Sequence, residues 1–230
     1  MAFRVAILAS GSGTTAESFI RACAGGQVDC TVELVIASKP TAGIVSRINN
    51  LNHELGLEIE CLVIGRSTHP PHRSEQLALG DQTEAEESAL LDVLSARTPD
   101  VIALMGYMKH IGPQLVERFG WLPTYDSIYQ ANMLNTHPGL LPETKGRWGE
   151  HVQEYVLSHA LATSGQTLHL VAHDYDDGPS VAEHIVPVEP GDTAETLFRR
   201  VQAVEKATIA YDIEAFAQAR ANYLSEIEEE

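Results

Sequence analysis

The feature that most constrains the fold is a regular alternation of short apolar runs with segments of helical periodicity. Apolar runs rich in β-branched residues occupy 3–9, 31–37, 59–64 and 101–105. Between them, residues 15–24, 42–55 and 82–97 repeat apolar side chains at helical spacing, and a loop is expected over 65–81. Continuous apolar runs are typical of parallel strands buried on both faces. The pattern therefore predicts an α/β fold with a doubly wound, mostly parallel sheet flanked by helices.

The second half of the chain repeats this style less regularly. We expect a short strand at 134–136, a helix at 151–159, strands at 167–172 and 180–188, and a helix from 193 to about 219. The run Gly191-Asp192-Thr193 is a typical helix start, because Asp192 or Thr193 can cap it. No internal repeat or linker is visible, so residues 1–230 are predicted to form a single domain. The acidic segment 222–230 is expected to be a frayed tail.

Composition excludes several classes of protein. The net charge of −17, from 32 acidic and 15 basic residues, argues against a nucleic-acid partner. No apolar run approaches the roughly 20 residues that span a bilayer, so no membrane association is expected. The N-terminus enters a strand without a signal-peptide pattern, and the three cysteines have no CxxC spacing. We therefore expect a cytoplasmic location and reduced cysteines.

A glycine-rich turn, Gly11-Ser12-Gly13-Thr14, joins the first strand to the first helix. Glycines let the backbone approach an anion closely, and a helix N-terminus offers unpaired N–H groups and partial positive charge. A phosphate or carboxylate would fit there, although an ordinary tight turn has the same pattern. The run also matches a dinucleotide-binding fingerprint, but Ser38-Lys39 stands where an acidic residue is expected.

Two further groups of polar residues could carry chemistry. Asn135 and His137 are separated by one residue at a predicted strand end, so they point to the same side. An amide can donate to an oxyanion, and an imidazole can transfer protons near neutral pH. The carboxylates of Asp174, Asp176 and Asp177 follow another predicted strand. They could transfer protons, bind a hard cation, or form a capped polar loop.

Five motifs in order resemble the folate-dependent formyltransferases, over roughly residues 4–217. The motifs are Gly11–Thr14, Gly106-Tyr107-Met108, Asn135-x-His137-Pro138-x-Leu140-Leu141-Pro142, Asp176-x-Gly178-Pro179 and Gly191-Asp192-Thr193. The resemblance implies a formyltransferase-like variant of the Rossmann fold. It also implies roles for individual residues: Asn135, His137 and Asp176 in catalysis; Gly11, Ser12, Gly13 and Thr14 at a ribose phosphate; Gln202 and Glu205 at the substrate amine and ribose; and Met108, Lys109, His110, Ile111, His173 and Asp174 at the folate.

Within that family, the resemblance is strongest to the branch that acts on glycinamide ribonucleotide in purine biosynthesis. It implies transfer of a formyl group from 10-formyltetrahydrofolate to the substrate amine through a tetrahedral intermediate, without a metal. The expected partners are small-molecule substrates, and a homodimer is left open. Two alternatives also stay open: a formyltransferase for another phosphorylated amine, such as an amino sugar nucleotide, and a nucleotide-binding module without turnover.

Three features depart from the family pattern. Thr15 and Lys109 stand where the family usually has Asn and Arg. Lysine is a point charge and arginine a planar fork, so Lys109 is expected to contact a folate differently from the arginine usual in the family. The segment 120–134 is longer than the corresponding family segment and carries Trp121, Tyr125 and Tyr129. It could be a lid over the pocket, a subunit contact, or a simple surface insertion.

Overall fold

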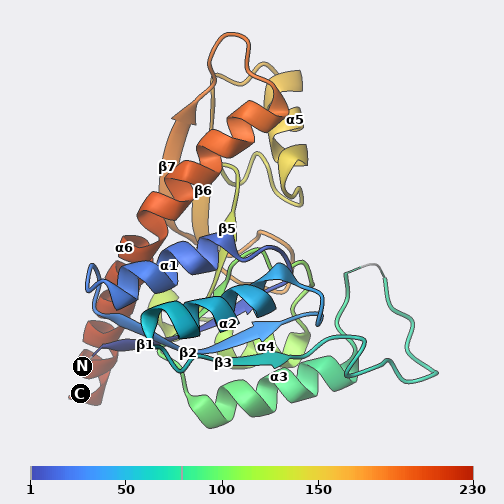
Figure 1. Cartoon of the computed structure of the whole chain (residues 1–230), viewed down its shortest axis with the longest axis vertical. Helices are drawn as coiled ribbons and strands as arrows, with labels where there is room; N and C mark the ends of the chain where they lie inside the picture. The colour runs from blue at the N-terminus through green and yellow to red at the C-terminus, as the bar shows by residue number, and fades with distance from the viewer. Residues whose placement is uncertain (1, 79, 230) are drawn as a thin grey trace.

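A computed structural model describes residues 2–78 and 80–229 of the chain. In these residues, seven strands form one sheet in the order β3-β2-β1-β4-β5-β6-β7 (Figure 1). Neighbours from β3 to β5 run parallel, whereas β6 and β7 are antiparallel additions at one edge. The strands are β1 (Phe3–Ala9), β2 (Cys30–Ala37), β3 (Glu60–Val63), β4 (Val101–Leu104), β5 (Met133–His137), β6 (Thr163–Leu170) and β7 (Ser180–Pro187). The predicted doubly wound, mostly parallel sheet is confirmed.

Helices cover both faces of the parallel strands. They are α1 (Thr14–Ala24), α2 (Gly43–Leu55), α3 (Glu84–Arg97), α4 (Pro113–Phe119), α5 (Glu150–Ser158), α6 (Ala194–Glu228) and the 3₁₀ turn η1 (Ile128–Gln130). One apolar cluster packs α1, α2 and α6 on the sheet, and a second packs α3 and α4 on the opposite face. The resulting three-layer arrangement leaves the carboxyl ends of the parallel strands at one open edge.

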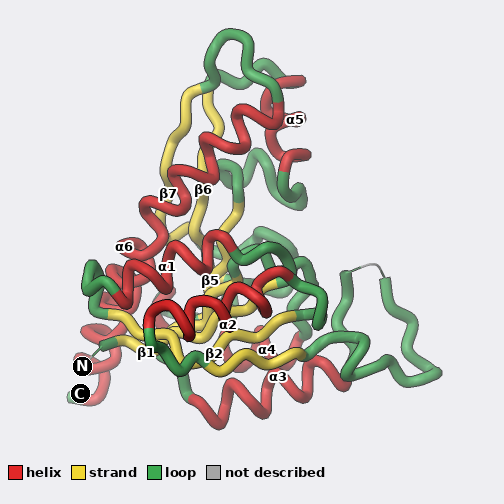
Figure 2. The backbone as a smooth tube through the Cα atoms, in the orientation of Figure 1, coloured by secondary structure: helices red, strands yellow, loops and turns green. Residues whose placement is uncertain are grey.

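The antiparallel strands extend away from this body as a lobe (Figure 2). There β6 and β7 pack with α5 and the N-terminal half of α6 around a small core of Val156, Val186, Leu197 and Val201. Because α6 runs along both the lobe and the main body, it ties the two parts together (Figure 1).

Element boundaries differ from the sequence predictions mainly in this second half. Strand β6 spans Thr163–Leu170 instead of 167–172, because residues 163–166 are too polar to read as a strand yet pair with β7. Helix α4 was not predicted; Pro113 begins it.

Of the segment 222–230, the residues up to Glu228 continue α6, which ends there. The extended part of α6 contacts the segment 120–134. The ring of Tyr223 lies 6.1 Å from that of Tyr129, and Arg220 Nε donates to the Ala131 carbonyl at 3.1 Å. These contacts hold α6 at Arg220 and Tyr223, whereas Glu226, Glu228 and Glu229 are exposed. Residue 230 lies outside the described residues.

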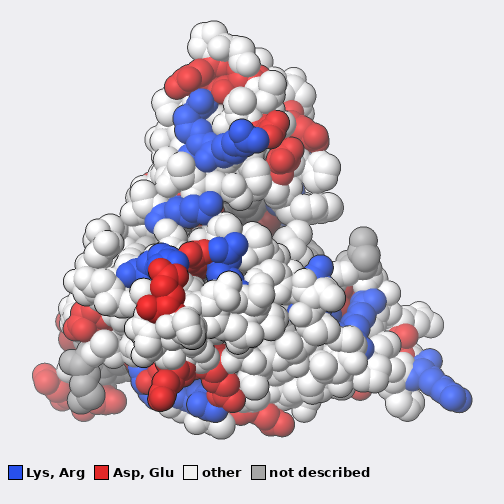
Figure 3. All heavy atoms as spheres, in the orientation of Figure 1, with Lys and Arg blue, Asp and Glu red and all other residues white. Residues whose placement is uncertain are grey.

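Charged side chains on the face formed by α1, α2 and α6 are interspersed in sign (Figure 3). Arg21 and Arg47 both pair with Glu17, and Arg200 pairs with Asp192. Much of the positive charge on this face is therefore neutralised locally. Over the described residues, we find no helix with the length and apolarity needed to cross a membrane.

Candidate active site

The glycine-rich turn has the geometry of an anion site. Gly13 is the N-cap of α1 with φ 74°, a left-handed conformation that favours glycine. A Cβ at Gly13 would lie 2.4 Å from the Cδ1 atom of Ile44, so α2 packs too closely for any side chain there. No side chain caps α1, which leaves its first amides free to bind an external group. Together with exposed Gly11 and Ser12, these amides can surround a phosphate.

Strand β5 presents Asn135 and His137 on one face, as the spacing predicts. Asn135 lies between Leu104 of β4 and His169 of β6 in the sheet register. The side chain of His137 is only 2% exposed, and its Nε2 is 2.9 Å from the hydroxyl of Thr144. That hydroxyl donates to the Leu140 carbonyl at 2.8 Å, so it accepts from Nε2–H of His137. The lone pair of the neutral imidazole is therefore on Nδ1.

Asp176 completes the predicted group of three. Its Oδ2 lies 3.5 Å from Nδ1 of His137, and its Oδ1 lies 3.5 Å from Nε2 of His169. The backbone amide of Gly146 donates to Oδ2 at 2.9 Å. Asp176 itself has φ 53°, an unfavourable conformation for a side-chain-bearing residue, which the surrounding contacts hold in place. The structure thus brings Asn135, His137 and Asp176 together.

The electrostatics of this group favour a neutral imidazole and an ionised carboxylate. Burial lowers the pKa of His137 to about 4, although the Asp176 carboxylate opposes that shift. For Asp176, burial raises the pKa, but the adjacent imidazoles of His169 and His137 and the hydrogen bond from the Gly146 amide together outweigh it, and the pKa falls below its usual value. In the ligand-free protein the Nδ1 lone pair of a neutral imidazole therefore faces an ionised carboxylate at 3.5 Å, and the two residues are not an ion pair.

His169 is a site residue that the sequence reasoning missed. Its Nδ1 donates to the Leu170 carbonyl at 2.9 Å, so Nε2 accepts from the Asn135 amide at 3.0 Å. This contact fixes which way the Asn135 amide points and leaves its second N–H free. Finding it requires the register that places residue 169 opposite residue 135, and one strand's sequence does not contain that information.

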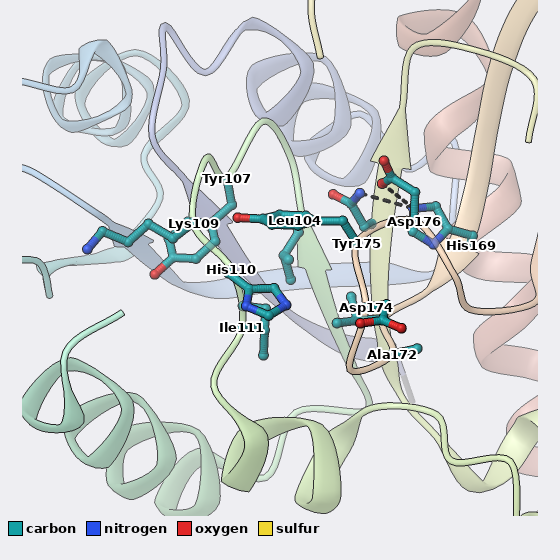
Figure 4. A pocket seen from close by; sticks show the side chains of 12 residues that line it. Leu104, Tyr107, Lys109, His110, Ile111, His169, Ala172, Asp174, Tyr175 and Asp176 are labelled. Atoms are coloured by element: carbon teal, nitrogen blue, oxygen red, sulfur yellow. Dashed lines mark hydrogen bonds and ion pairs between the residues drawn. The ribbon is translucent and has the colours of Figure 1, made fainter. Parts of the chain in front are cut away.

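An open cavity lies beside Asp176 (Figure 4), and Asn135 also lines it. Of the residues predicted to contact folate, Lys109, His110, Ile111 and Asp174 line it; the rest of its wall is Leu104, Tyr107, Asn135, His169, Val171, Ala172, Tyr175 and Asp176. The cavity therefore combines apolar and polar side chains, among them Asn135 and Asp176, whereas the buried His137 does not line it.

Three of the predicted folate residues contribute differently from the expectation. Met108 is 53% exposed and does not line the cavity, and His173 contributes its backbone carbonyl, which accepts from His110 at 2.7 Å. The ammonium group of Lys109 pairs with the fully buried carboxylate of Glu86. Its charge consequently points away from the other lining side chains (Figure 4). Lys109 therefore does not present a free cation to a folate in this cavity, because its only charged group is already neutralised by Glu86.

Glu205 connects the glycine-rich turn to strand β5. The residue is 8% exposed, and Oε2 accepts a hydrogen bond from the Thr15 hydroxyl at 3.2 Å. Burial raises the pKa of Glu205, while hydrogen bonds from Thr136 and Thr15 counteract part of that rise. Gln202 lies one turn earlier on α6 and is half-buried. The two predicted amine- and ribose-binding residues thus share a helix face next to the turn.

Two other expectations can be compared with the structure. Trp121, Tyr125 and Tyr129 pack against the cluster beneath α6, and none of them lines the cavity, so the lid alternative has no support. Within residues 2–78 and 80–229, no three histidine, cysteine, aspartate or glutamate side chains are grouped as metal ligands. Whether the reaction needs a metal stays a prediction.

Comparisons with known proteins agree with this geometry. A family model described as formyl transferase matches residues 3–213. The chain is 29% identical to phosphoribosylglycinamide formyltransferase of Escherichia coli, over 94% of this chain and 88% of that protein. It is similar to the crystal structure of phosphoribosylglycinamide formyltransferase from Bacillus halodurans, with 33% identity, a TM-score of 0.72, and coverage of 92% and 94% of the two chains. The corresponding structure from Brucella melitensis gives 31% identity, a TM-score of 0.73, and coverage of 94% and 96%.

Proposed function

This chain belongs to the formyl transferase family, and on that basis we propose that it transfers a formyl group from 10-formyltetrahydrofolate to the amine of glycinamide ribonucleotide. One observation carries the proposal. An amide, a buried imidazole and a carboxylate converge beside a cavity, and Glu205 links the strand that carries the amide and the imidazole to the first turn of α1. A reaction between a phosphorylated amine and a folate needs an anion site for the first substrate and a cavity for the second.

His137 is suited to accept the proton that the amine must lose. Its pKa of about 4 makes the imidazole neutral at physiological pH, with the lone pair on Nδ1. As the amine nitrogen bonds to the formyl carbon, Nδ1 can take up the proton. The carboxylate of Asp176, 3.5 Å away, then stabilises the imidazolium that forms. Collapse of the tetrahedral intermediate breaks the bond between the formyl carbon and the folate nitrogen, and that leaving nitrogen takes up the proton from the imidazolium.

Asn135 is suited to stabilise the oxyanion of the tetrahedral intermediate. One amide hydrogen is committed to His169, and the other is free to donate to developing negative charge. Because His169 already holds the amide, little reorganisation is needed during the reaction. A preorganised donor of this kind contributes on the order of 3 kcal/mol.

Substrate placement follows from the same arrangement. The phosphate of the ribonucleotide would bind the amides of the glycine-rich turn, and Glu205 with Gln202 would contact its ribose and amine. The folate would occupy the cavity that Ile111, His110 and Tyr175 line. Holding both substrates side by side converts a two-molecule encounter into an intramolecular step, which supplies much of the acceleration.

The decisive experiment follows release of deformylated folate from 10-formyltetrahydrofolate, with glycinamide ribonucleotide as acceptor. We expect turnover without added metal, and at least about a hundredfold loss of kcat in His137→Ala. His53→Ala is the matched control, because His53 is exposed on α2. Transfer to an amino sugar nucleotide, with none to glycinamide ribonucleotide, would show that the proposed acceptor is wrong. Nucleotide binding with no turnover would identify a non-catalytic module.

The remaining parts of the proposal concern the setting of the reaction. The partners are the two small-molecule substrates, and no nucleic acid is involved. The cytoplasm is the expected compartment, since Cys23, Cys30 and Cys61 are all free thiols, which fits a reducing environment. The surface of segment 120–134 is the candidate contact should the chain form a homodimer.

A further inference from the structure

We propose that Thr15 is a positioning residue for substrate recognition, acting through Glu205. The inference rests on the proposed function, because it concerns how the amine-bearing substrate is held. It starts from a single contact across a long sequence separation: the Thr15 hydroxyl, in the first turn of α1, donates to Oε2 of Glu205 at 3.2 Å.

Glu205 needs such a partner because of where it lies. The carboxylate is on α6, buried between the first turn of α1 and strand β5, on the side of β5 opposite to Asn135 and His137. A buried carboxylate without donors is costly and has no fixed direction. The hydroxyls of Thr15 and Thr136 approach it from two elements, and the charge of Lys206 acts in the same direction. These donors favour the ionised form in one orientation.

A carboxylate held in this way retains lone pairs for a ligand. It has about four acceptor positions, and the two threonine hydroxyls use only part of them. The remaining positions lie next to the glycine-rich turn, because Thr15 directly follows Thr14. A substrate with phosphate on that turn would place hydroxyl or ammonium donors against Glu205. Thr15 therefore aligns the phosphate site and the acceptor carboxylate with one another.

The test replaces Thr15 with valine, which keeps the side-chain shape and removes the donor. We expect the KM for glycinamide ribonucleotide to rise about tenfold, with a smaller change in kcat and none in the KM for folate. Direct calorimetric binding of the ribonucleotide should weaken by the same factor. Loss of the donor also destabilises the ionised carboxylate, so the acid limb of kcat/KM should move to higher pH. Thr15→Ser keeps the hydroxyl donor, so its KM for glycinamide ribonucleotide, its affinity and its pH profile should match those of the wild type.

Ser18→Ala is the matched control for packing between α1 and α6. Ser18 lies almost one turn further along α1, and its hydroxyl donates to the Lys206 carbonyl of α6 at 3.1 Å. This control removes a comparable contact between the same two helices without touching Glu205, and we expect wild-type kinetics. Equal effects of Thr15→Val and Ser18→Ala, or no effect of Thr15→Val, would overturn the inference. A wild-type protein without turnover would instead overturn the proposed function, and with it this inference.

Discussion

The protonation state of His137 can be tested through the pH dependence of stability. Its pKa is about 4 in the folded protein, because the ring is buried, against a usual value of about 6.5 in an unfolded chain. Between these values the unfolded chain binds one more proton than the folded chain. The contribution of His137 to stability is thus complete above pH 6.5 and decreases as the pH falls toward 4.

The size of this effect follows from the two pKa values. On lowering the pH from 7 to 5, the unfolded imidazole becomes almost fully protonated while the buried ring stays mostly neutral. Integrating the difference in bound protons gives a loss of about 2 kcal/mol from this one residue. Asp176, with its lowered pKa, stays ionised over this interval. A comparison with a variant that lacks His137 removes the contribution of the other groups that titrate between pH 7 and pH 5.

The assay compares urea unfolding of the wild type and His137→Gln at pH 7 and at pH 5. Other histidines titrate in both proteins and cancel in the comparison. We expect the wild type to lose about 2 kcal/mol more than the variant between the two pH values. Equal losses in both proteins would show that the folded pKa of His137 is not depressed. That result would also remove the neutral imidazole from the mechanism, since a ring with an ordinary pKa would be partly charged near pH 6.5.

Three shorter predictions test other parts of the structure. Asn135→Ala should lower kcat by about 10²–10³-fold in steady-state assays while the KM values change little, because one oxyanion donor is lost. Gly13→Ala should lower the free energy of unfolding by more than 1 kcal/mol and weaken ribonucleotide binding, because Gly13 has a left-handed backbone and packs against α2. Gly11→Ala is the control and should fold normally, because a Cβ at Gly11 would meet nothing within 4 Å. Tyr129→Ala should reduce hydrogen-exchange protection in the last turns of α6 by about 1 kcal/mol and leave formyl transfer unchanged, because only its ring contacts with Phe216 and Tyr223 are lost.

The parallel half of the sheet could be predicted because its strands carry their own signal. Residues 5–9 and 34–37 are apolar throughout, since both of their faces are covered by helices. The start of β6 gives no such signal. Gly165 and Gln166 are buried there, but they pair with β7 in a lobe whose small core comes from other elements. A polar segment becomes a buried strand only because its partner strand follows it.

In the candidate site, too, some features could be predicted from local sequence and others depend on long-range packing. The alternation of Asn135 and His137 is local, so their shared face could be predicted from spacing alone. The contact of Asn135 with His169 depends on the antiparallel register of β5 and β6, which no property of either segment specifies. The hydrogen bond between Thr15 and Glu205 joins residues 190 positions apart. Such pairs arise from the packing of complete helices on the sheet.

The protonation state of the His137 imidazole could not be predicted from the sequence. Residue types around His137 suggest a cation, because Asp176 is close and a carboxylate normally favours the charged ring. Burial reverses that expectation: the loop between Pro138 and Gly149 folds over the ring, Thr144 takes its Nε2–H, and Gly146 holds the carboxylate from the other side. The same loop thus excludes water, selects the tautomer and positions the acid. A neutral base next to a fixed carboxylate follows from these three contacts acting on one buried ring, whichever amine the enzyme formylates.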